Sequence, residues 1–415
     1  MARICLISPG HLTSNPRLVK EADALTDAGH EVTVITGWSF PPHQSEDRRF
    51  ESRSWAQQQR VAFGALASLQ RRFWQHLRQR LARVLVRMGA QDPAVAIRAW
   101  HLAGPDLIRA AQRIRADFYI AHYPAALPAA ALAARVHGGR YSFDAEDFHL
   151  GDFPEGPSYD FQRQLLRLIE GRYLPDCMFT TAASPGIADA YADAYGISLP
   201  IVLRNMFPLA HAPEGPTPRG TAIPGPSLYW FSQTIGPDRG LECAVRSLAL
   251  ARCKPHLHLR GFISTVYRDQ LMDLACQLGV DSRLHLHPPQ SPEQMERLAS
   301  KYDVGLVAET GCTPNRSIAL TNKLFTYALA GIPMLLSDIP AHRALQAEAG
   351  EAVRLFRTDD QASLAKGLDD WLDAPPGKLA LARQAAYRLG RERWNWEQEQ
   401  QILLGQLTQL SSAIG

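Results

Sequence analysis

The chain has 415 residues, of which 46% are hydrophobic and 20% are charged, and its formal net charge is +3. This length exceeds what a single hydrophobic core usually covers, so we expect two domains of about 200 residues each. No apolar run reaches the roughly 18–20 residues of a membrane-spanning helix. The small net charge gives no case for a nucleic-acid partner.

Six cysteines are scattered along the chain without a CxxC pair or the Cys/His spacing of zinc sites. We therefore expect them to be reduced, buried and inert. The apolar run in residues 1–8 has no cleavage site after it, and it predicts a first strand rather than a secretion signal.

The first half of the chain alternates between strand and helix patterns. Apolar, β-branched runs at 3–7 and 31–36 lie on either side of a helical pattern at 16–29, which is typical of a βαβ unit. Further strands are expected at 117–121, 141–143, 178–181 and 201–203, with helices at 125–136, 159–173 and 185–195. This alternation predicts a doubly wound parallel sheet, and we assign the first domain to residues 1–206.

Residues 207–226 are rich in Pro and Gly and are expected to form a linker. Beyond it, strands are expected at 227–231, 256–259, 283–286, 304–307 and 333–336, with helices at 240–251, 265–278 and 321–330. They predict a second doubly wound domain over residues 227–390 that faces the first across a cleft. Residues 391–415 should form a C-terminal helix that crosses back and caps the fold.

A basic insertion at about 41–104 interrupts the first domain. Positions 48–100 hold eleven Arg, against Glu51 and Asp92 as the acidic residues. Within it, residues 65–88 have the pattern of an amphipathic helix whose apolar stripe is Leu66, Leu69, Phe73, Leu77, Leu81, Val84 and Met88.

Two interpretations of this helix stay open. It either packs on the domain with a solvated arginine face, or lies in an anionic membrane interface, where each basic residue contributes about 1 kcal/mol. We expect a cytoplasmic protein under either interpretation, and the second adds peripheral contact with the inner face of the membrane.

Candidate site residues follow the strands of the first domain, because ligands of doubly wound sheets bind outside the carboxyl ends of strands. The loop after the first strand is either an ordinary connection or a cleft-facing loop that exposes Gly10, His11, Asn15 and Arg17. His122, at the end of the strand 117–121, is either a satisfied core residue or a side chain that meets substrate.

A third loop of this domain carries Asp144, Glu146, Asp147 and His149. Four ionisable groups within six residues repel one another unless they are solvated or have partners. We expect them to bind sugar hydroxyls or to order the cleft, with a solvated loop or a metal site as alternatives.

The strongest local signal lies at residues 321–333. Thr321 or Asn322 can cap a helix whose free N–H groups and dipole favour a phosphate, and Lys323 adds a full positive charge. Arg239, after the first strand of the second domain, is expected at the same edge. Two cations at one helix end predict a binding site for a leaving nucleoside diphosphate, and this site would need no metal ion.

Several segments of the chain have the order and spacing of motifs in one family. They are 15–35, 169–184, 203–208, the Arg239-Gly240 pair, and Asn322-Lys323-Leu324-Phe325 with Ala330-Gly331-Ile332-Pro333. Over nearly the whole chain, the sequence resembles the retaining family-4 glycosyltransferases of GT-B fold, in which two Rossmann-like domains face a central cleft.

The resemblance implies transfer of a sugar from a nucleoside-diphosphate sugar to a glycan, a lipid-linked sugar or a small molecule, with retention at the anomeric carbon. It implies no metal cofactor. His122, Arg239 and Lys323 would be the catalytic residues, with Arg239 and Lys323 on the diphosphate and His122 beside the donor sugar. The donor-binding candidates are Gln233, Thr234, Arg239, Glu309, Asn322, Lys323, Leu324 and Thr326. The acceptor-side candidates are Gly10, His11, Asn15, Arg17, Asp144, Glu146 and Asp147.

The sequence departs from the family at several of these positions. The family's pair of glutamates is replaced by Ile318 and Thr326, so the Thr326 hydroxyl or the Glu309 carboxylate is the candidate for their role. Gln233 replaces a basic residue, and Glu146-Asp147 replaces a His-Glu pair. These departures leave open an alternative, a catalytically silent GT-B subunit that supports a partner glycosyltransferase.

Overall fold

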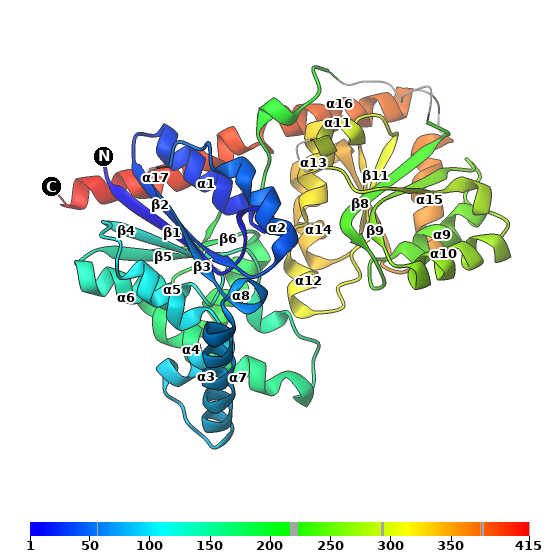
Figure 1. The fold of residues 1–415 in the computed structure, drawn as a ribbon. Coiled ribbons are helices and arrows are strands. Elements are labelled where there is room, and N and C mark those ends of the chain that lie inside the picture. Colours follow the sequence, from blue (N-terminus) through cyan, green and yellow to red (C-terminus); the bar gives the residue numbers. More distant parts are fainter. Residues whose placement is uncertain (56, 216–222, 292–293, 374, 376, 415) are drawn as a thin grey trace. The chain divides into compact units, whose positions relative to one another are not determined.

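The computed structural model describes residues 1–55, 57–215, 223–291, 294–373, 375 and 377–414. The chain divides into two compact α/β units, Met1–Leu203 with Gln400–Gly415, and Arg204–Glu399 (Figure 1). The division falls ahead of residues 207–226, the expected linker. Residues 207–215 and 223–226 belong to the second unit, and 216–222 lie outside the described residues.

The first unit is built on a seven-stranded sheet in the order β3-β2-β1-β4-β5-β6-β7, and every neighbouring pair is parallel. The strands are β1 Arg3–Ser8, β2 Glu31–Trp38, β3 Gln57–Ala62, β4 Phe118–His122, β5 Arg140–Ala145, β6 Thr180–Ala182 and β7 Ile201–Val202. The helices are α1 Pro16–Asp27, α2 Pro41–Glu46, α3 Leu69–Arg87, α4 Pro93–Trp100, α5 Gly104–Ala111, α6 Leu127–His137, α7 Asp160–Tyr173 and α8 Pro185–Tyr195. The strand order reverses between β1 and β4, which is where doubly wound sheets bind ligands.

The helix α1 begins where the sequence provides a start signal. Asn15 caps it by accepting a hydrogen bond from the Leu18 N–H, and Pro16 occupies the first turn, where a missing N–H costs nothing. Its apolar face packs on β1 and β2 together with Leu403 and Leu407. These two leucines belong to α17, Trp396–Ile414, so the end of the chain completes the core of the first unit.

The basic insertion contains a strand as well as helices, which corrects the expectation of a purely helical segment. Strand β3 pairs with β2 from Thr33 to Trp38 and forms one edge of the sheet. It is followed by α3, which packs on α4. The insertion is therefore part of the first unit's sheet.

The second unit is built on a six-stranded parallel sheet in the order β10-β9-β8-β11-β12-β13. Its strands are β8 Ser227–Ile235, β9 His256–Ile263, β10 Leu284–His287, β11 Val304–Val307, β12 Met334–Ser337 and β13 Val353–Phe356. Its helices are α9 Leu241–Leu250, α10 Thr265–Gln277, α11 Met295–Ala299, α12 Pro314–Ile318, α13 Asn322–Ala330, α14 Pro340–Ala349, α15 Gln361–Leu372 and α16 Gly377–Glu392. Here the strand order reverses between β8 and β11.

All six cysteines are free, but they are not all buried as expected. Cys5 and Cys243 are buried, Cys177 and Cys253 are half-buried, and Cys276 and Cys312 are exposed. Among the described residues, no helix is both long enough and apolar enough to cross a membrane.

Candidate functional site

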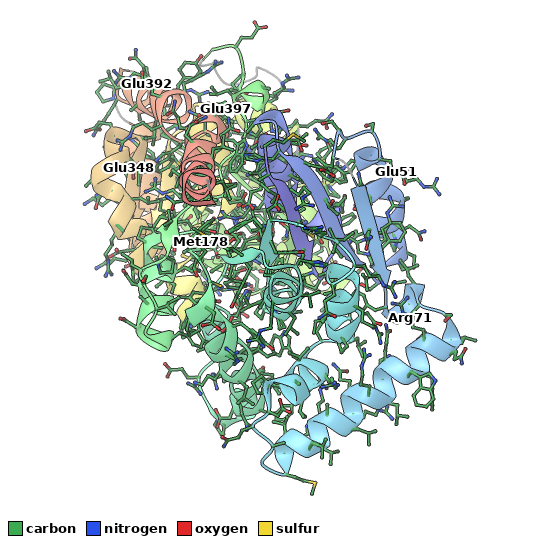
Figure 2. All side chains as sticks on the ribbon, turned by 90° about the vertical axis from the view of Figure 1, so that its left-hand side faces the viewer. Glu51, Arg71, Met178, Glu348, Glu392 and Glu397 are labelled. Carbon is green, nitrogen blue, oxygen red and sulfur yellow. The ribbon has the colours of Figure 1, made fainter. Side chains whose placement is uncertain are left out.

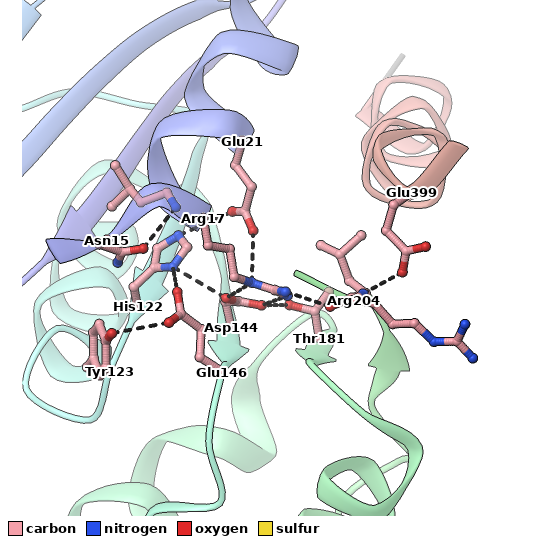
Figure 3. A network of polar contacts seen from close by, with 12 residues as sticks. Asn15, Arg17, Glu21, His122, Tyr123, Asp144, Glu146, Thr181, Arg204 and Glu399 are labelled. Carbon is pink, nitrogen blue, oxygen red and sulfur yellow. Dashed lines mark hydrogen bonds and ion pairs between the residues drawn. The ribbon is translucent and has the colours of Figure 1, made fainter. Parts of the chain in front are cut away.

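A buried network of charged side chains lies where β4 and β5 end in the first unit (Figure 3). Arg17 donates from Nε and Nη2 to the two carboxylate oxygens of Asp144, each at 2.6 Å. It also donates from Nη1 to the Leu203 carbonyl oxygen at 2.6 Å. Thr181, from β6, donates to the same carboxylate. Arg17 and Asp144 are both fully buried, so this is an enclosed two-bond ion pair.

His122, at the end of β4, lies among three carboxylates. Its Nε2 is 3.2 Å from Glu21 Oε2, and its Nδ1 is 3.3 Å from Asp144 Oδ2 and 3.8 Å from Glu146 Oε1. Burial alone would lower the pKa of His122, but Glu21, Asp144 and Glu146 together raise this pKa well above its usual value. The raised pKa favours the imidazolium form of His122. The burial of Asp144 would raise its pKa, but Arg17 and His122 outweigh this burial and lower the Asp144 pKa.

The raised pKa of His122 predicts that stability depends on pH. A group whose pKa is raised in the folded state contributes its full stability below the unfolded pKa, here 6.5. That contribution is lost as pH rises toward the folded value. We expect the free energy of unfolding, measured by urea titration, to fall as pH rises above 6.5, and His122→Gln to flatten this slope. An equal slope in parent and variant would contradict the assigned charge.

Glu21, His122 and Asp144 also offer ligand atoms that lie within 4.8 Å of one another, as a cation site requires. All three side chains are fully buried, and Asp144 and Glu21 already face the guanidinium of Arg17. A divalent cation there would be repelled by this guanidinium and by the His122 proton. We therefore assign the group as an ion-pair network that holds α1 against β4 and β5.

His11 is not exposed to a cleft, which corrects the expectation from the sequence. Its Nε2 accepts hydrogen bonds from the backbone N–H groups of Ser39 and Phe40, both at 3.1 Å. Nδ1 must then carry the proton, which it donates to Asp47 Oδ2 at 2.8 Å. His11 is a buried structural residue that ties the start of the insertion to the loop after β1.

The other residues expected to face a cleft are also largely enclosed. The side chains of Arg17, His122 and Asp144 are fully buried, so they have no exposed surface to offer a ligand in this structure. Asn15 is buried as the cap of α1. Gly10 is half-buried, and a Cβ there would lie 3.2 Å from Ser14 Oγ.

The acidic segment after β5 is not a solvated loop, because its side chains turn to separate partners. Asp144 joins Arg17, and the half-buried Glu146 accepts a hydrogen bond from Tyr123 Oη at 3.1 Å. His149 is buried with its Nδ1 3.1 Å from Asp152 Oδ2. Asp147 is half-buried. The expected repulsion is relieved by pairing within the unit.

The second unit gathers cations where β8 and β11 end and α13 begins. Lys323 Nζ lies 3.0 Å from Glu309 Oε1, and each side chain is 7% exposed. Burial would raise the pKa of Glu309, but Lys323, Arg316 and Arg239 outweigh it and lower this pKa below its usual value. Glu309 is therefore ionised, and three cations act on a single carboxylate.

Gly240 allows the two loops of this site to touch. Its φ is 66°, and a Cβ there would lie 2.5 Å from the Ala308 carbonyl oxygen and 2.7 Å from the Ala308 Cβ. A side chain at this position would therefore separate the loop that carries Arg239 from the loop that carries Glu309. Arg316 Nη1 supports the same contact by donating to the Asp238 carbonyl oxygen at 3.3 Å.

The helix α13 presents its N-terminus at this place. Its first N–H groups have no partner within the helix, and the helix dipole favours an anion there. Thr321 has the extended backbone of a cap, but its Oγ1 has no hydrogen-bond partner among the described residues. Asn322 is exposed, as are Gln233 and Thr234, which lie in β8 at an irregularity of its pairing with β9.

Two donor-site expectations are wrong. The Leu324 side chain is buried in the core of the second unit, so it has no surface for a nucleotide. Thr326 is 1% exposed and donates to Glu296 Oε1 at 3.2 Å, so its hydroxyl is already used inside the unit. Of the two candidates for the missing glutamate pair, Glu309 alone lies beside the cations.

Sequence reasoning missed His342, in α14. It is fully buried, and its Nδ1–H donates to the Ser337 carbonyl oxygen at 2.7 Å, so Nε2 is a bare acceptor. This Nε2 has no hydrogen-bond partner within the described part of the chain. Burial lowers the pKa of His342 to about 4, and Glu309 and Lys323 both act on it. The Ser337-Asp338 turn after β12 was the available signal in the sequence, but only the fold brings His342 near enough for Glu309 and Lys323 to affect its pKa.

Comparison with known proteins shows similarity in structure. No protein-family model matches the chain, and no curated protein matches its sequence. HepE from Anabaena, solved with UDP-glucose, is 15% identical over 99% of this chain and 100% of its own, with a TM-score of 0.69. Sucrose-phosphate synthase from Thermosynechococcus elongatus is 14% identical over 100% of both chains, with a TM-score of 0.70.

A third similar structure is the lipopolysaccharide outer core galactosyltransferase WaaB. It is 12% identical over 98% of this chain and 99% of its own, with a TM-score of 0.62. At such identities the likeness concerns the fold, and the two Rossmann-like parallel-sheet units agree with it. The chain therefore has the GT-B fold of these glycosyltransferases, as its sequence motifs predicted.

Proposed function

We propose that the chain transfers a sugar from a nucleoside-diphosphate sugar to an acceptor, with retention of the anomeric configuration and without a metal ion. The observation that carries this proposal is that Lys323, in the first turn of α13, and the nearby Arg316 and Arg239 all act on the single Glu309 carboxylate. A helix N-terminus with three cations suits a diphosphate. HepE, which shares the fold, was solved with UDP and with UDP-glucose.

In this proposal the main catalytic effect is electrostatic. Lys323 and Arg239 stabilise the negative charge that develops on the leaving diphosphate. Glu309 fixes the ammonium of Lys323 through its 3.0 Å contact. The leaving phosphate takes the acceptor's proton on the same face, which gives retention. The exposed Asn322, Gln233 and Thr234 contact the nucleotide, and the acceptor is a glycan, a lipid-linked sugar or a small molecule.

The first experiment is a thermal-shift screen with UDP, GDP, ADP, TDP and CMP, each with EDTA and with Mg²⁺. We expect one nucleoside diphosphate to raise Tm by about 3–6 °C at ten times its Kd, equally in both conditions. Arg239→Gln should reduce this shift, whereas Arg297→Gln, on an exposed residue of α11, should not. No shift with any nucleotide would favour a catalytically silent subunit, and a shift that requires Mg²⁺ would refute the metal-free site.

A further inference from the structure

We propose that α3 and the arginines around it form a docking surface for an anionic membrane, independently of the reaction that the chain catalyses. The helix lies at the edge of the first unit (Figure 2) and turns large apolar side chains to solvent. Their exposed fractions are 84% for Leu69, 61% for Phe73, 59% for Trp74, 58% for Leu81, 49% for Val84, 48% for Leu85 and 78% for Met88, directly after the helix.

The inward face of α3 is made of smaller and more polar residues. Gln75, Ala82 and Val86 are buried, and Gln75 Nε2 donates to Asp106 Oδ2 at 3.1 Å. A helix on a protein surface normally buries its largest apolar side chains. In α3 these side chains instead occupy an outward arc of about 160° at 3.6 residues per turn. The stripe predicted from the sequence is therefore not the packing face, and a contiguous exposed apolar patch of this kind marks an interaction site.

Basic side chains lie along one edge of this apolar arc, because at 3.6 residues per turn Arg80 and Arg87 fall beside Leu69 and Arg72 falls about 60° beyond it. Arg72 and Arg80 are exposed, and within the described ranges neither side chain has a partner. Arg87 lies over the ring of Phe161 at 4.7 Å from its centroid. Arginines beside an apolar stripe place positive charge at the level of lipid phosphates when the stripe enters the hydrocarbon layer.

A hollow at the N-terminal end of α3 adds a place for a headgroup. Its volume is about 550 Å³, and its charged lining is Arg60, Arg71, Arg109, Arg113 and Asp106, with Trp74 at the same opening. Asp106 is already neutralised, because Arg71, Arg78 and Arg109 all pair with it. The hollow therefore has an excess of positive charge beside the apolar stripe.

An anionic membrane complements both the apolar arc and the arginines of this docking surface. It offers hydrocarbon to the apolar arc and phosphates to the arginines, and Trp and Phe side chains favour the boundary between the two layers. A nucleic acid would satisfy the arginines but leave the apolar arc in water. A second copy in a symmetric dimer would bring arginines against arginines.

The test measures sedimentation of the full-length protein with vesicles of phosphatidylcholine, with and without about one third phosphatidylglycerol, in about 0.1 M NaCl. We expect at least tenfold stronger partitioning onto the anionic vesicles. The double variants Phe73→Ser/Leu81→Ser and Arg72→Gln/Arg80→Gln should each weaken it at least tenfold. The matched controls are Leu199→Ser/Leu381→Ser and Arg297→Gln/Arg388→Gln, which change exposed residues elsewhere and should partition like the parent.

Two results would overturn the proposal. One is a failure of the vesicle comparison: the parent sediments equally with both kinds of vesicle, or the α3 variants sediment with anionic vesicles as much as the parent does. The other is a dimer of the parent in sedimentation velocity that Phe73→Ser/Leu81→Ser dissociates while no vesicle binding is found, since this would assign the face to self-association. Circular dichroism and Tm should be unchanged in the variants because the replaced side chains are exposed.

Discussion

Lys323→Ala is expected to lower kcat for sugar transfer by about a hundredfold, which is the usual effect of removing one group that stabilises charge in the transition state. The substitution also leaves Glu309, 3.0 Å from the lost ammonium, as a buried negative charge where the diphosphate should bind. The lost ammonium and the uncompensated carboxylate both make the negative charge on the leaving diphosphate less stable. Initial rates with a radiolabelled nucleotide sugar would measure the loss.

The double variant Lys323→Ala/Glu309→Gln separates the two contributions, because it removes the stranded carboxylate along with the cation. We expect it to recover part of the lost rate. Lys366→Ala, at an exposed position of α15, is the control and should keep the parent's rate. If folded Lys323→Ala retains more than a third of the parent's turnover, Lys323 does not face the leaving group.

Arg17→Met is expected to lower the free energy of unfolding by about 3–5 kcal/mol, which is typical of removing one partner from a buried ion pair. The variant leaves the Asp144 carboxylate without its two 2.6 Å hydrogen bonds from Arg17, and it leaves Glu21 with His122 as its remaining basic neighbour among the described residues. Neither carboxylate can reach water in the folded state, because each is about 1% exposed. Urea unfolding followed by near-UV circular dichroism would measure the change.

Arg268→Met provides the matched control. Arg268 pairs with Asp269 at 2.9 Å, but both side chains are half exposed, so its loss should cost less than about 1 kcal/mol. In the double variant Arg17→Met/Asp144→Leu, the loss should be smaller than the sum of the single losses. A parent-like midpoint for Arg17→Met would show that the network contributes little to stability.

Most strands could be predicted because buried parallel strands are continuous apolar runs. Strand β11, Val304–Val307, coincides with its expected range. Strand β3, Gln57–Ala62, was missed because its sequence, QQQRVA, has no such run. It is an edge strand, and its pairing with β2 supplies the stability that its own side chains do not indicate.

The candidate site was predictable where its signals are local. The start of α13 with Lys323 and the Arg239-Gly240 turn follow from a helical pattern, a charge and a glycine within a few positions. The burial of Arg17 and His11 was not predictable, because their partners lie 127 and 36 residues away along the chain. Whether a polar side chain meets a ligand or a buried partner depends on such distant pairings.

The contact between His11 and Asp47 bears on how this insertion could be exchanged between proteins. Asp47 also accepts a hydrogen bond from the Thr13 N–H at 2.8 Å, so the segment that begins the insertion completes the loop after β1. A chimera that replaced residues 41–104 would remove this carboxylate together with the strand β3. A chimera that exchanges only α3 keeps Asp47 and β3. The helix α3 is therefore the segment to transplant onto a related scaffold.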